Sequence, residues 1–292
     1  MSTNQFKGTG VALVTPFKSD LSIDFEALKQ LLDHVSEGDV EYLVVLGTTG
    51  EAPTVTAKEK NEVIEFVLAN NPKNLPVVYG LGGNSTKWTI DQLDLVKDYD
   101  LAAILSLSPY YNKPSQMGIQ KHYEAIADAS PFPVILYNVP ARTSSNVTAE
   151  TTINLSKHPN IIGTKEASGN LAQCMEIQQN TPDDFILISG DDPLTLPMMS
   201  FGCVGAISVI ANIQPKTFSD MIRYGLAGNF EEANKLHMQM MTGYDLVGKE
   251  GNPVSVKTGL EALGLMKRDV RLPLFEGSKE LLRHFKMYLG DK

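Results

Sequence analysis

The sequence has few of the features that mark secreted, membrane-bound or nucleic-acid-binding proteins. Two cysteines in 292 residues, Cys174 and Cys203, give no framework of paired cysteines, which fits a reducing cytoplasm. No run of about 18 apolar residues occurs, and the first five residues lack a signal pattern. The 25 basic against 34 acidic residues give a net charge of −9, which argues against nucleic acid and anionic membranes as partners. We therefore expect a soluble, cytoplasmic protein.

Histidines are also scarce, and their positions do not suit a metal site. None of the five follows an expected strand, and no two have the spacing of metal ligands on a helix; they are His34, His122, His158, His237 and His284. A metal-dependent aldolase, which needs histidine or carboxylate ligands, is therefore disfavoured, and we predict no metal. No Gly-x-Gly-x-x-Gly follows the first expected strand, which weakens the case for an open, doubly wound nucleotide-binding sheet.

Eight short apolar runs alternate with amphipathic segments over most of the chain. Continuous apolar runs are typical of parallel strands that are covered on both faces. We expect strands at Val11–Val14, Tyr42–Leu46, Val77–Gly80, Ala102–Leu107, Val134–Tyr137, Ile161–Lys165, Phe185–Ser189 and Val204–Val209. Helical periodicity separates them, and eight such units predict an α/β fold, the (β/α)8 TIM barrel. The open, doubly wound sheet is the alternative.

After the eighth unit only helical patterns remain. They cover residues 230–246, 254–263 and 277–289. We therefore predict a barrel catalytic domain over residues 1–225 and a small C-terminal helical domain over residues 226–292. A hydrophobic fraction of 42% is enough for a core of this size.

The sixth expected strand ends in a lysine. Alternation places Ile161, Gly163 and Lys165 on the inner face of the barrel and Glu166 on the outer face. Desolvation there disfavours the ammonium, and a free amine can attack a ketone to form a Schiff base. Gly163 would leave room beneath such an imine, and Glu166 would not pair with the amine. Taken alone, a lysine that reaches water or a carboxylate explains the pattern as well.

Other strand ends carry groups that suit a ketoacid. The second strand runs into Gly47-Thr48-Thr49-Gly50-Glu51, a turn whose N–H groups and hydroxyls can hold a carboxylate. After the fifth strand, the Tyr137 phenol can move a proton and Arg142 can bind a carboxylate. Asp191 and Asp192 stand where many barrels bind phosphate, which disfavours a phosphorylated substrate or pyridoxal phosphate. A plain turn, a core tyrosine and a surface arginine are the structural alternatives.

Three segments resemble the signatures of the pyruvate-dependent class I aldolase/lyase family. They are Gly47-Thr48-Thr49-Gly50-Glu51, Tyr137-Asn138-Val139-Pro140-x-Arg142 and Gly163-Thr164-Lys165-Glu166, and the likeness extends from about Gly8 to the C-terminal helices. The paired threonines and Arg142 favour the branch that condenses pyruvate with L-aspartate-4-semialdehyde in diaminopimelate and lysine biosynthesis. The N-acetylneuraminate lyase branch usually has serine in place of the first threonine. That lyase, a 2-keto-3-deoxy sugar acid aldolase and a non-catalytic ligand-binding barrel stay open as alternatives.

The resemblance also implies roles for eight residues. It makes Lys165 the Schiff-base residue, Tyr137 the general acid/base, Thr48 and Tyr111 its proton relay, Thr49 and Arg142 the ligands of the two substrate carboxylates, and Gly190 and Ile207 part of the pocket wall. It implies no cofactor besides the covalent pyruvate imine. It further implies a homotetramer built from tight dimers, with Tyr111 donated by a neighbouring subunit.

One departure from the family concerns feedback inhibition. Lysine-inhibited relatives have histidines and a glutamate around an effector pocket at the dimer interface. Here Ala57 and Lys60 stand at the histidine positions and Trp88 at the glutamate position, although Asn84 and Tyr110 are kept. Lys60 would repel the effector's ammonium, and Trp88 removes an anion that would attract it. We therefore predict weak or absent inhibition by lysine.

Overall fold

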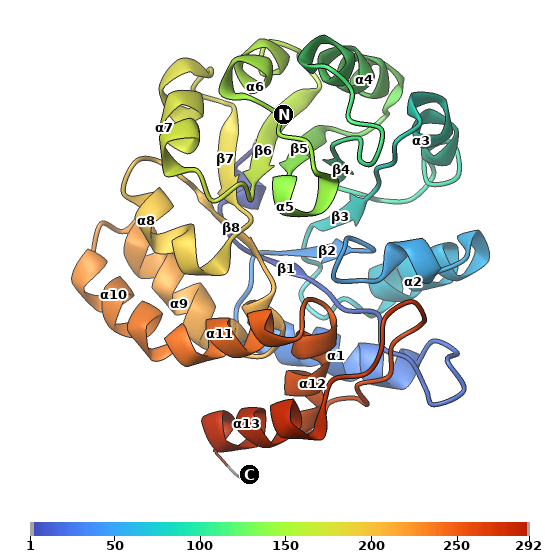
Figure 1. Ribbon diagram of the computed structural model, residues 1–292, viewed down its shortest axis with the longest axis vertical. Helices are drawn as coiled ribbons and strands as arrows, with labels where there is room; N and C mark the ends of the chain where they lie inside the picture. Colours follow the sequence, from blue (N-terminus) through green and yellow to red (C-terminus); the bar gives the residue numbers. More distant parts are fainter. Residues whose placement is uncertain (1–2, 291–292) are drawn as a thin grey trace.

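The protein is a closed barrel of eight parallel strands inside a ring of helices, as the computed structural model shows for residues 3–290 (Figure 1). The strands pair in chain order, and β1 pairs with β8 to close the barrel. They are β1 (Gly8–Ala12), β2 (Tyr42–Val45), β3 (Val77–Gly80), β4 (Ala103–Leu107), β5 (Val134–Asn138), β6 (Ile161–Glu166), β7 (Ile186–Ser189) and β8 (Gly205–Ser208). The predicted (β/α)8 fold is confirmed, and the open sheet is excluded.

Helices follow the strands, and most begin at a side chain that caps the first turn. The N-cap oxygens of Asp24, Thr56 and Ser115 each accept a hydrogen bond from the backbone N–H three residues on. The helices are α1 (Phe25–Glu37), α2 (Ala57–Asn70), α3 (Thr86–Leu93), α4 (Gln116–Ala129), α5 (Pro140–Thr143), α6 (Ala149–Leu155), α7 (Leu171–Asn180), α8 (Thr195–Met199) and α9 (Pro215–Leu226). Short 3-10 turns are η1 (Thr3–Phe6), η2 (Ala52–Thr54), η3 (Asp192–Leu194) and η4 (Ile210–Asn212).

The chain after α9 forms four more helices. They are α10 (Phe230–Gln239), α11 (Met241–Lys249), α12 (Val254–Ala262) and α13 (Lys279–Leu289). The predicted single helix over residues 230–246 is wrong: the chain bends at Met240, which is fully buried, so that α10 packs on α9 while α11 packs on α12 and α13. The proposed division into residues 1–225 and 226–292 stays a prediction, and its last two residues lie outside the described residues.

The first strand begins three residues before the predicted Val11–Val14. The prediction missed this start because residues 8 and 10 are glycines, which are weak signals for a strand. Both positions lack the space for a side chain. A Cβ on Gly10 would collide with the ring of Tyr42, which fills the bottom of the barrel against Phe6. Close packing inside the barrel therefore determines these residues more than their strand propensity does.

A bulge changes the alternation at the start of β6. The register between β5 and β6 shifts, so that Val134 pairs with Ile161 while Ile135 pairs with Gly163. Ile161 consequently packs in the core between barrel and helices, and its predicted place on the inner face is wrong. The structure gives a different reason for Gly163, and the predicted room beneath an imine stays a prediction. A Cβ there would lie 2.5 Å from Ile186 Cγ1 and 2.6 Å from the Ile186 carbonyl oxygen, so the close approach of β7 requires the glycine.

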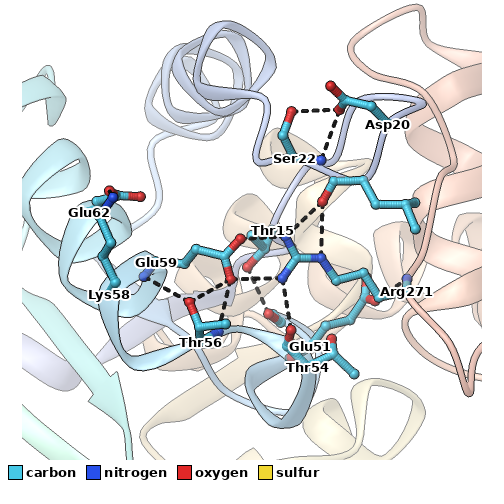
Figure 2. A network of polar contacts seen from close by, with 12 residues as sticks. Thr15, Asp20, Ser22, Glu51, Thr54, Thr56, Lys58, Glu59, Glu62 and Arg271 are labelled. Atoms are coloured by element: carbon cyan, nitrogen blue, oxygen red, sulfur yellow. Dashed lines mark hydrogen bonds and ion pairs between the residues drawn. The ribbon is translucent and has the colours of Figure 1, made fainter.

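The loop between α12 and α13 is tied to the N-terminal half of the chain through Arg271. Figure 2 shows its guanidinium between Glu59 on α2 and backbone carbonyls of two loops. Nη2 donates to Glu59 Oε1 at 2.5 Å and Nη1 to Glu59 Oε2 at 2.9 Å. Nη1 also donates to the Thr54 carbonyl at 2.8 Å, and Nη2 to the Leu21 carbonyl at 2.7 Å. Glu59 completes the capping box of Thr56, so one carboxylate serves both contacts.

We expect the Glu59–Arg271 contact to stabilise the fold in a pH-dependent way. Hydrogen bonds from Arg271 lower the pKa of Glu59 from 4.5 to about 2. A carboxyl with a lowered native pKa stabilises the fold above its unfolded pKa, and this contribution is lost as the pH falls through the native value. Glu59→Gln should therefore reduce the free energy of unfolding by about 1–3 kcal/mol at pH 7, and by less than half as much at pH 3.

Urea unfolding at the two pH values measures this difference. Glu62→Gln is the matched control on the same helix, because its ion pair with Lys58 is exposed and should contribute little. The same loss for both variants, or a loss that does not change with pH, would contradict the expectation.

Candidate active site

A cavity of about 390 Å³ opens at the carboxyl ends of the strands. Residues of seven strands or of the segments that follow them line it, together with α11 and the residues after it. Seven of the eight predicted site residues line it: Thr48, Thr49, Tyr137, Arg142, Lys165, Gly190 and Ile207. A cavity of this size suits small-molecule ligands.

Lys165 and Tyr137 lie side by side in the cavity wall. They are register partners on β6 and β5, and Lys165 Nζ lies 4.3 Å from the centre of the Tyr137 ring. Both side chains are buried. In the described part of the chain no carboxylate forms a salt bridge with Lys165. The amine is therefore positioned in a mostly dry environment beside a phenol.

Glu166 points out of the barrel, as predicted, and its carboxylate is bound there. It accepts hydrogen bonds from Asn138 Nδ2 at 3.0 and 3.1 Å, from Gln173 Nε2 at 3.1 Å and from the Ser168 N–H at 2.8 Å. These bonds join β5, β6 and α7. The residue after Lys165 thus fixes the strand end without pairing with the amine.

Gly190, directly after β7, faces Lys165 at a point where there is no room for a side chain. A Cβ at this position would lie 2.9 Å from Lys165 Cε and 2.8 Å from Ala167 Cβ. Real Cβ contacts are not this short, so a side chain at residue 190 would displace the lysine or the strand. The glycine therefore leaves the space that the Lys165 side chain occupies.

The turn after β2 is held in an unusual conformation. The residues on either side of Gly47–Gly50, Leu46 and Glu51, have φ values of 55° and 54°, which side chains rarely adopt. Thr15 Oγ1 donates to the Gly50 carbonyl at 2.7 Å, which ties the turn to the residues after β1. Thr48 and Thr49 are thereby fixed at the cavity.

Asn252, between α11 and α12, connects two parts of the site and was not predicted. Its Nδ2 donates to Thr49 Oγ1 at 2.9 Å, and its carbonyl oxygen accepts from Arg142 Nη2 at 3.2 Å. Its side-chain Oδ1 is buried and has no hydrogen-bond partner within residues 3–290. The search for site residues at strand ends could not find Asn252, because it lies on the C-terminal segment and follows no strand.

The two aspartates after β7 also line the cavity. Burial raises the pKa of both Asp191 and Asp192. Asp192 Oδ2 accepts hydrogen bonds from the N–H groups of Val209 and Ile210, at 3.0 and 2.8 Å. Its carboxylate is therefore bound to the backbone after β8, and the negative charge interacts with Lys165 without a direct ion pair.

Tyr111 is the one predicted site residue that the fold does not bring to the cavity. It is 86% exposed, and its φ of 73° turns the loop after β4 outward. Within the described residues, no hydrogen bond joins the hydroxyls of Thr48, Tyr111 and Tyr137. The proton relay of these three groups is not assembled within a single chain.

Two features of other protein classes are absent from residues 3–290. No three His, Cys, Asp or Glu side chains in this range come together as metal ligands. No helix in it is both long and apolar enough to cross a bilayer.

Comparison with known proteins gives close relatives over nearly the whole chain. Residues 5–291 match the Dihydrodipicolinate synthetase family. A 4-hydroxy-tetrahydrodipicolinate synthase of Flavobacterium psychrophilum is 48% identical over 97% of each chain, and one of Archaeoglobus fulgidus is 42% identical over 97% of each. Among solved structures, dihydrodipicolinate synthase from Aquifex aeolicus has a TM-score of 0.93 at 36% identity and 97% coverage of both chains. The one from Thermotoga maritima has a TM-score of 0.94 at 33% identity, also with 97% coverage of both.

The identities and the coverage agree with the three resembling segments and with the arrangement of the cavity. The chain therefore belongs to the dihydrodipicolinate synthetase family.

Proposed function

We propose that this chain has 4-hydroxy-tetrahydrodipicolinate synthase activity, with Lys165 as the residue that binds pyruvate covalently. The second substrate is L-aspartate-4-semialdehyde, and the product belongs to diaminopimelate and lysine biosynthesis. One observation carries the assignment of residues. Lys165 lies beside Tyr137 in a cavity whose wall also contains the Thr48–Thr49 turn and Arg142.

The proposed reaction begins at the lysine. Nζ of Lys165 adds to the ketone carbon of pyruvate, and loss of water gives an imine. The imine withdraws electrons, so the methyl group loses a proton and becomes the nucleophilic carbon of an enamine. Tyr137 is the phenol placed to move protons at this point. The covalent imine would take the place of a separate cofactor.

The enamine carbon then attacks the aldehyde carbon of the semialdehyde, whose oxygen takes up a proton to become a hydroxyl. The amino group of the semialdehyde next adds to the imine carbon and expels the Lys165 amine. This closes the ring of 4-hydroxy-tetrahydrodipicolinate and frees the enzyme. One water is lost in total, from the ketone oxygen of pyruvate.

The two substrates each carry a carboxylate, and two parts of the cavity suit them. The N–H groups and hydroxyls of the Thr48–Thr49 turn suit the carboxylate of pyruvate. Arg142 suits that of the semialdehyde, because a guanidinium binds a carboxylate through two parallel hydrogen bonds. Asn252 contacts both groups and would keep the two positions at a fixed separation.

The homotetramer of tight dimers is part of this proposal, as is a cytoplasmic location. The exposed, outward-turned Tyr111 supports an assembly in which another subunit receives this side chain. The relay with Thr48 and Tyr137 would then be completed across a subunit boundary.

Covalent trapping tests the assignment of Lys165. Borohydride reduction with pyruvate should add a three-carbon group to Lys165, detected by intact mass and peptide mapping. Lys165→Met should abolish the adduct and lower the rate of semialdehyde consumption at least about 100-fold, since the covalent route is lost. Lys267→Met, at an exposed lysine, should leave both unchanged.

Three outcomes would count against the proposal. An unmodified mass would favour a binding protein, and an adduct on another lysine would refute the assignment of Lys165. Release of pyruvate from a sialic acid or a 2-keto-3-deoxy sugar acid, without consumption of the semialdehyde, would identify a different aldolase.

A second prediction concerns the space around the lysine. Gly190→Ala should slow imine formation about 10- to 100-fold, because the new methyl group would displace Lys165 Cε. The rate of borohydride trapping measures the effect. Gly248→Ala is the control, because it makes the same change at the cavity wall where a Cβ meets no atom within 4 Å. Equal trapping rates for the two variants would show that the contact does not matter.

A third prediction concerns feedback by lysine. Lys60 is partly buried, which lowers its pKa, and Trp88 is 43% exposed in place of a carboxylate. We expect millimolar lysine to reduce the rate less than about twofold, because no anion attracts the effector's ammonium. The double variant Lys60→His, Trp88→Glu should become more sensitive. Clear inhibition of the wild-type enzyme would contradict this prediction.

A further inference from the structure

One ion pair lies outside the cavity and is completely buried. Lys257 on α12 and Glu51 at the end of the threonine turn are 0% and 1% exposed, and Lys257 Nζ lies 2.5 Å from Glu51 Oε1. Lys257 also donates to the Asp269 carbonyl at 2.9 Å and lies 4.1 Å from the centre of the Phe17 ring. Every other ion pair found among residues 3–290 has at least one side chain more than a tenth exposed.

Stability alone does not explain why two charges are buried at this position. Removing both ions from water has a large cost, and a pair of apolar side chains of similar volume is often as stable. Burial lowers the pKa of Lys257 to about 8, although Glu51 opposes this shift. The fold therefore keeps a costly contact where an apolar one would suffice for packing.

The pair is attached to a part of the site whose backbone is strained. Glu51 has a φ of 54°, a conformation that persists only where the surroundings enforce it. Its carboxylate is fixed on both oxygens, since Oε1 meets Lys257 and Oε2 accepts from the Arg271 N–H at 3.2 Å. Asn252 holds the same turn at Thr49. Figure 2 shows Glu51 below the contact between Arg271 and Glu59.

All three contacts come from one stretch of the chain, residues 252–271. They reach the turn at its middle and at its end, more than two hundred positions away in the sequence. Thr49 and Glu51 are the members of the turn whose side chains receive these contacts. Residues 252–271 thus hold the turn at its middle and its end, while Thr15 ties the Gly50 carbonyl to the residues after β1.

We propose that the buried Lys257–Glu51 pair positions the Thr48–Thr49 turn to receive the carboxylate of the ketoacid. Lys257 does not line the cavity, so it is a positioning residue that acts through Glu51. The inference rests on the proposed role of the turn in binding pyruvate. A pair that only attaches α12 to the barrel would lower stability when removed, without selectively weakening the binding of a carboxylate.

The double variant Glu51→Gln, Lys257→Met tests the proposal. It removes both charges with little change in volume, whereas each single variant leaves a charge buried and unpaired and can fail to fold. The measurement is borohydride trapping on Lys165 against pyruvate concentration. We expect the half-saturating pyruvate concentration to rise about tenfold or more, as for the loss of a charge-assisted contact. Trapping at saturating pyruvate should fall less than about threefold, since the lysine itself is untouched.

Two controls separate positioning from a general loss of structure. The first is the double variant Glu261→Gln, Arg268→Met, which removes an ion pair between α12 and the loop after it, in which neither Glu51 nor Lys257 takes part. Its half-saturation should stay within about twofold of the wild type. The second is acetone, a ketone without a carboxylate, which should trap equally well on the wild type and on the Glu51/Lys257 variant. Thermal melts followed by circular dichroism establish that each variant is folded at the assay temperature.

The outcomes are distinct. Wild-type half-saturation for pyruvate in the folded Glu51/Lys257 variant would overturn the positioning role, and so would an equal rise in the Glu261/Arg268 control or an equal loss of acetone trapping. Failure of the wild-type enzyme to trap pyruvate at any concentration would instead overturn the proposed function.

Discussion

The pairing of β5 with β6 is the constraint on which the site depends. In this parallel pair Tyr137 lies opposite Lys165, and the register fixes both side chains toward the cavity. A slip of one residue would turn the lysine to the outer face, because side chains alternate along a strand. The bulge at Val134 and Ile135 shifts the register before the functional residues are reached. Asn138 then binds the Glu166 carboxylate at the far end of the same pair, which limits any slip.

A closed barrel provides the strand ends but does not by itself complete the site. The strands bring Lys165 and Tyr137 together, while the turn after β2 and the short helix α5 bring Thr49 and Arg142 to the cavity. The C-terminal part of the chain holds both segments, through Asn252 at Thr49 and Arg142 and through Lys257 at Glu51. Arg271 adds a third attachment at Glu59 (Figure 2). The proposed site therefore depends on packing between residues 49–59 and residues 252–271, which are about two hundred positions apart in the sequence.

Local patterns in the sequence were sufficient to predict the features that depend on a single strand. Continuous apolar runs gave all eight strands, and alternation placed Lys165 and Tyr137 inside the barrel. Alternation failed at Ile161, because a bulge depends on the neighbouring strand, and the close approach of Ile186 to Gly163 could not be predicted from one strand alone. The bend at Met240 was missed because two short helices that bury one continuous face have the same periodicity as a single long helix. Asn252 and Lys257 were out of reach, since neither follows a strand and their partners are some two hundred residues away.

The distribution of buried carboxylates gives the proposed chemistry its physical basis. An amine that is to attack a ketone must not be held as an ammonium by a neighbouring anion. Three carboxylates near the strand ends are each bound by a different partner. Glu166 is bound by side-chain amides and a backbone N–H outside the barrel, Asp192 by the N–H groups after β8, and Glu51 by Lys257. These three carboxylates are thus bound by other groups, and within the described residues none of them forms an ion pair with Lys165. The second buried lysine, Lys257, follows the same pattern, because it pairs with Glu51, the buried carboxylate at the end of the threonine turn.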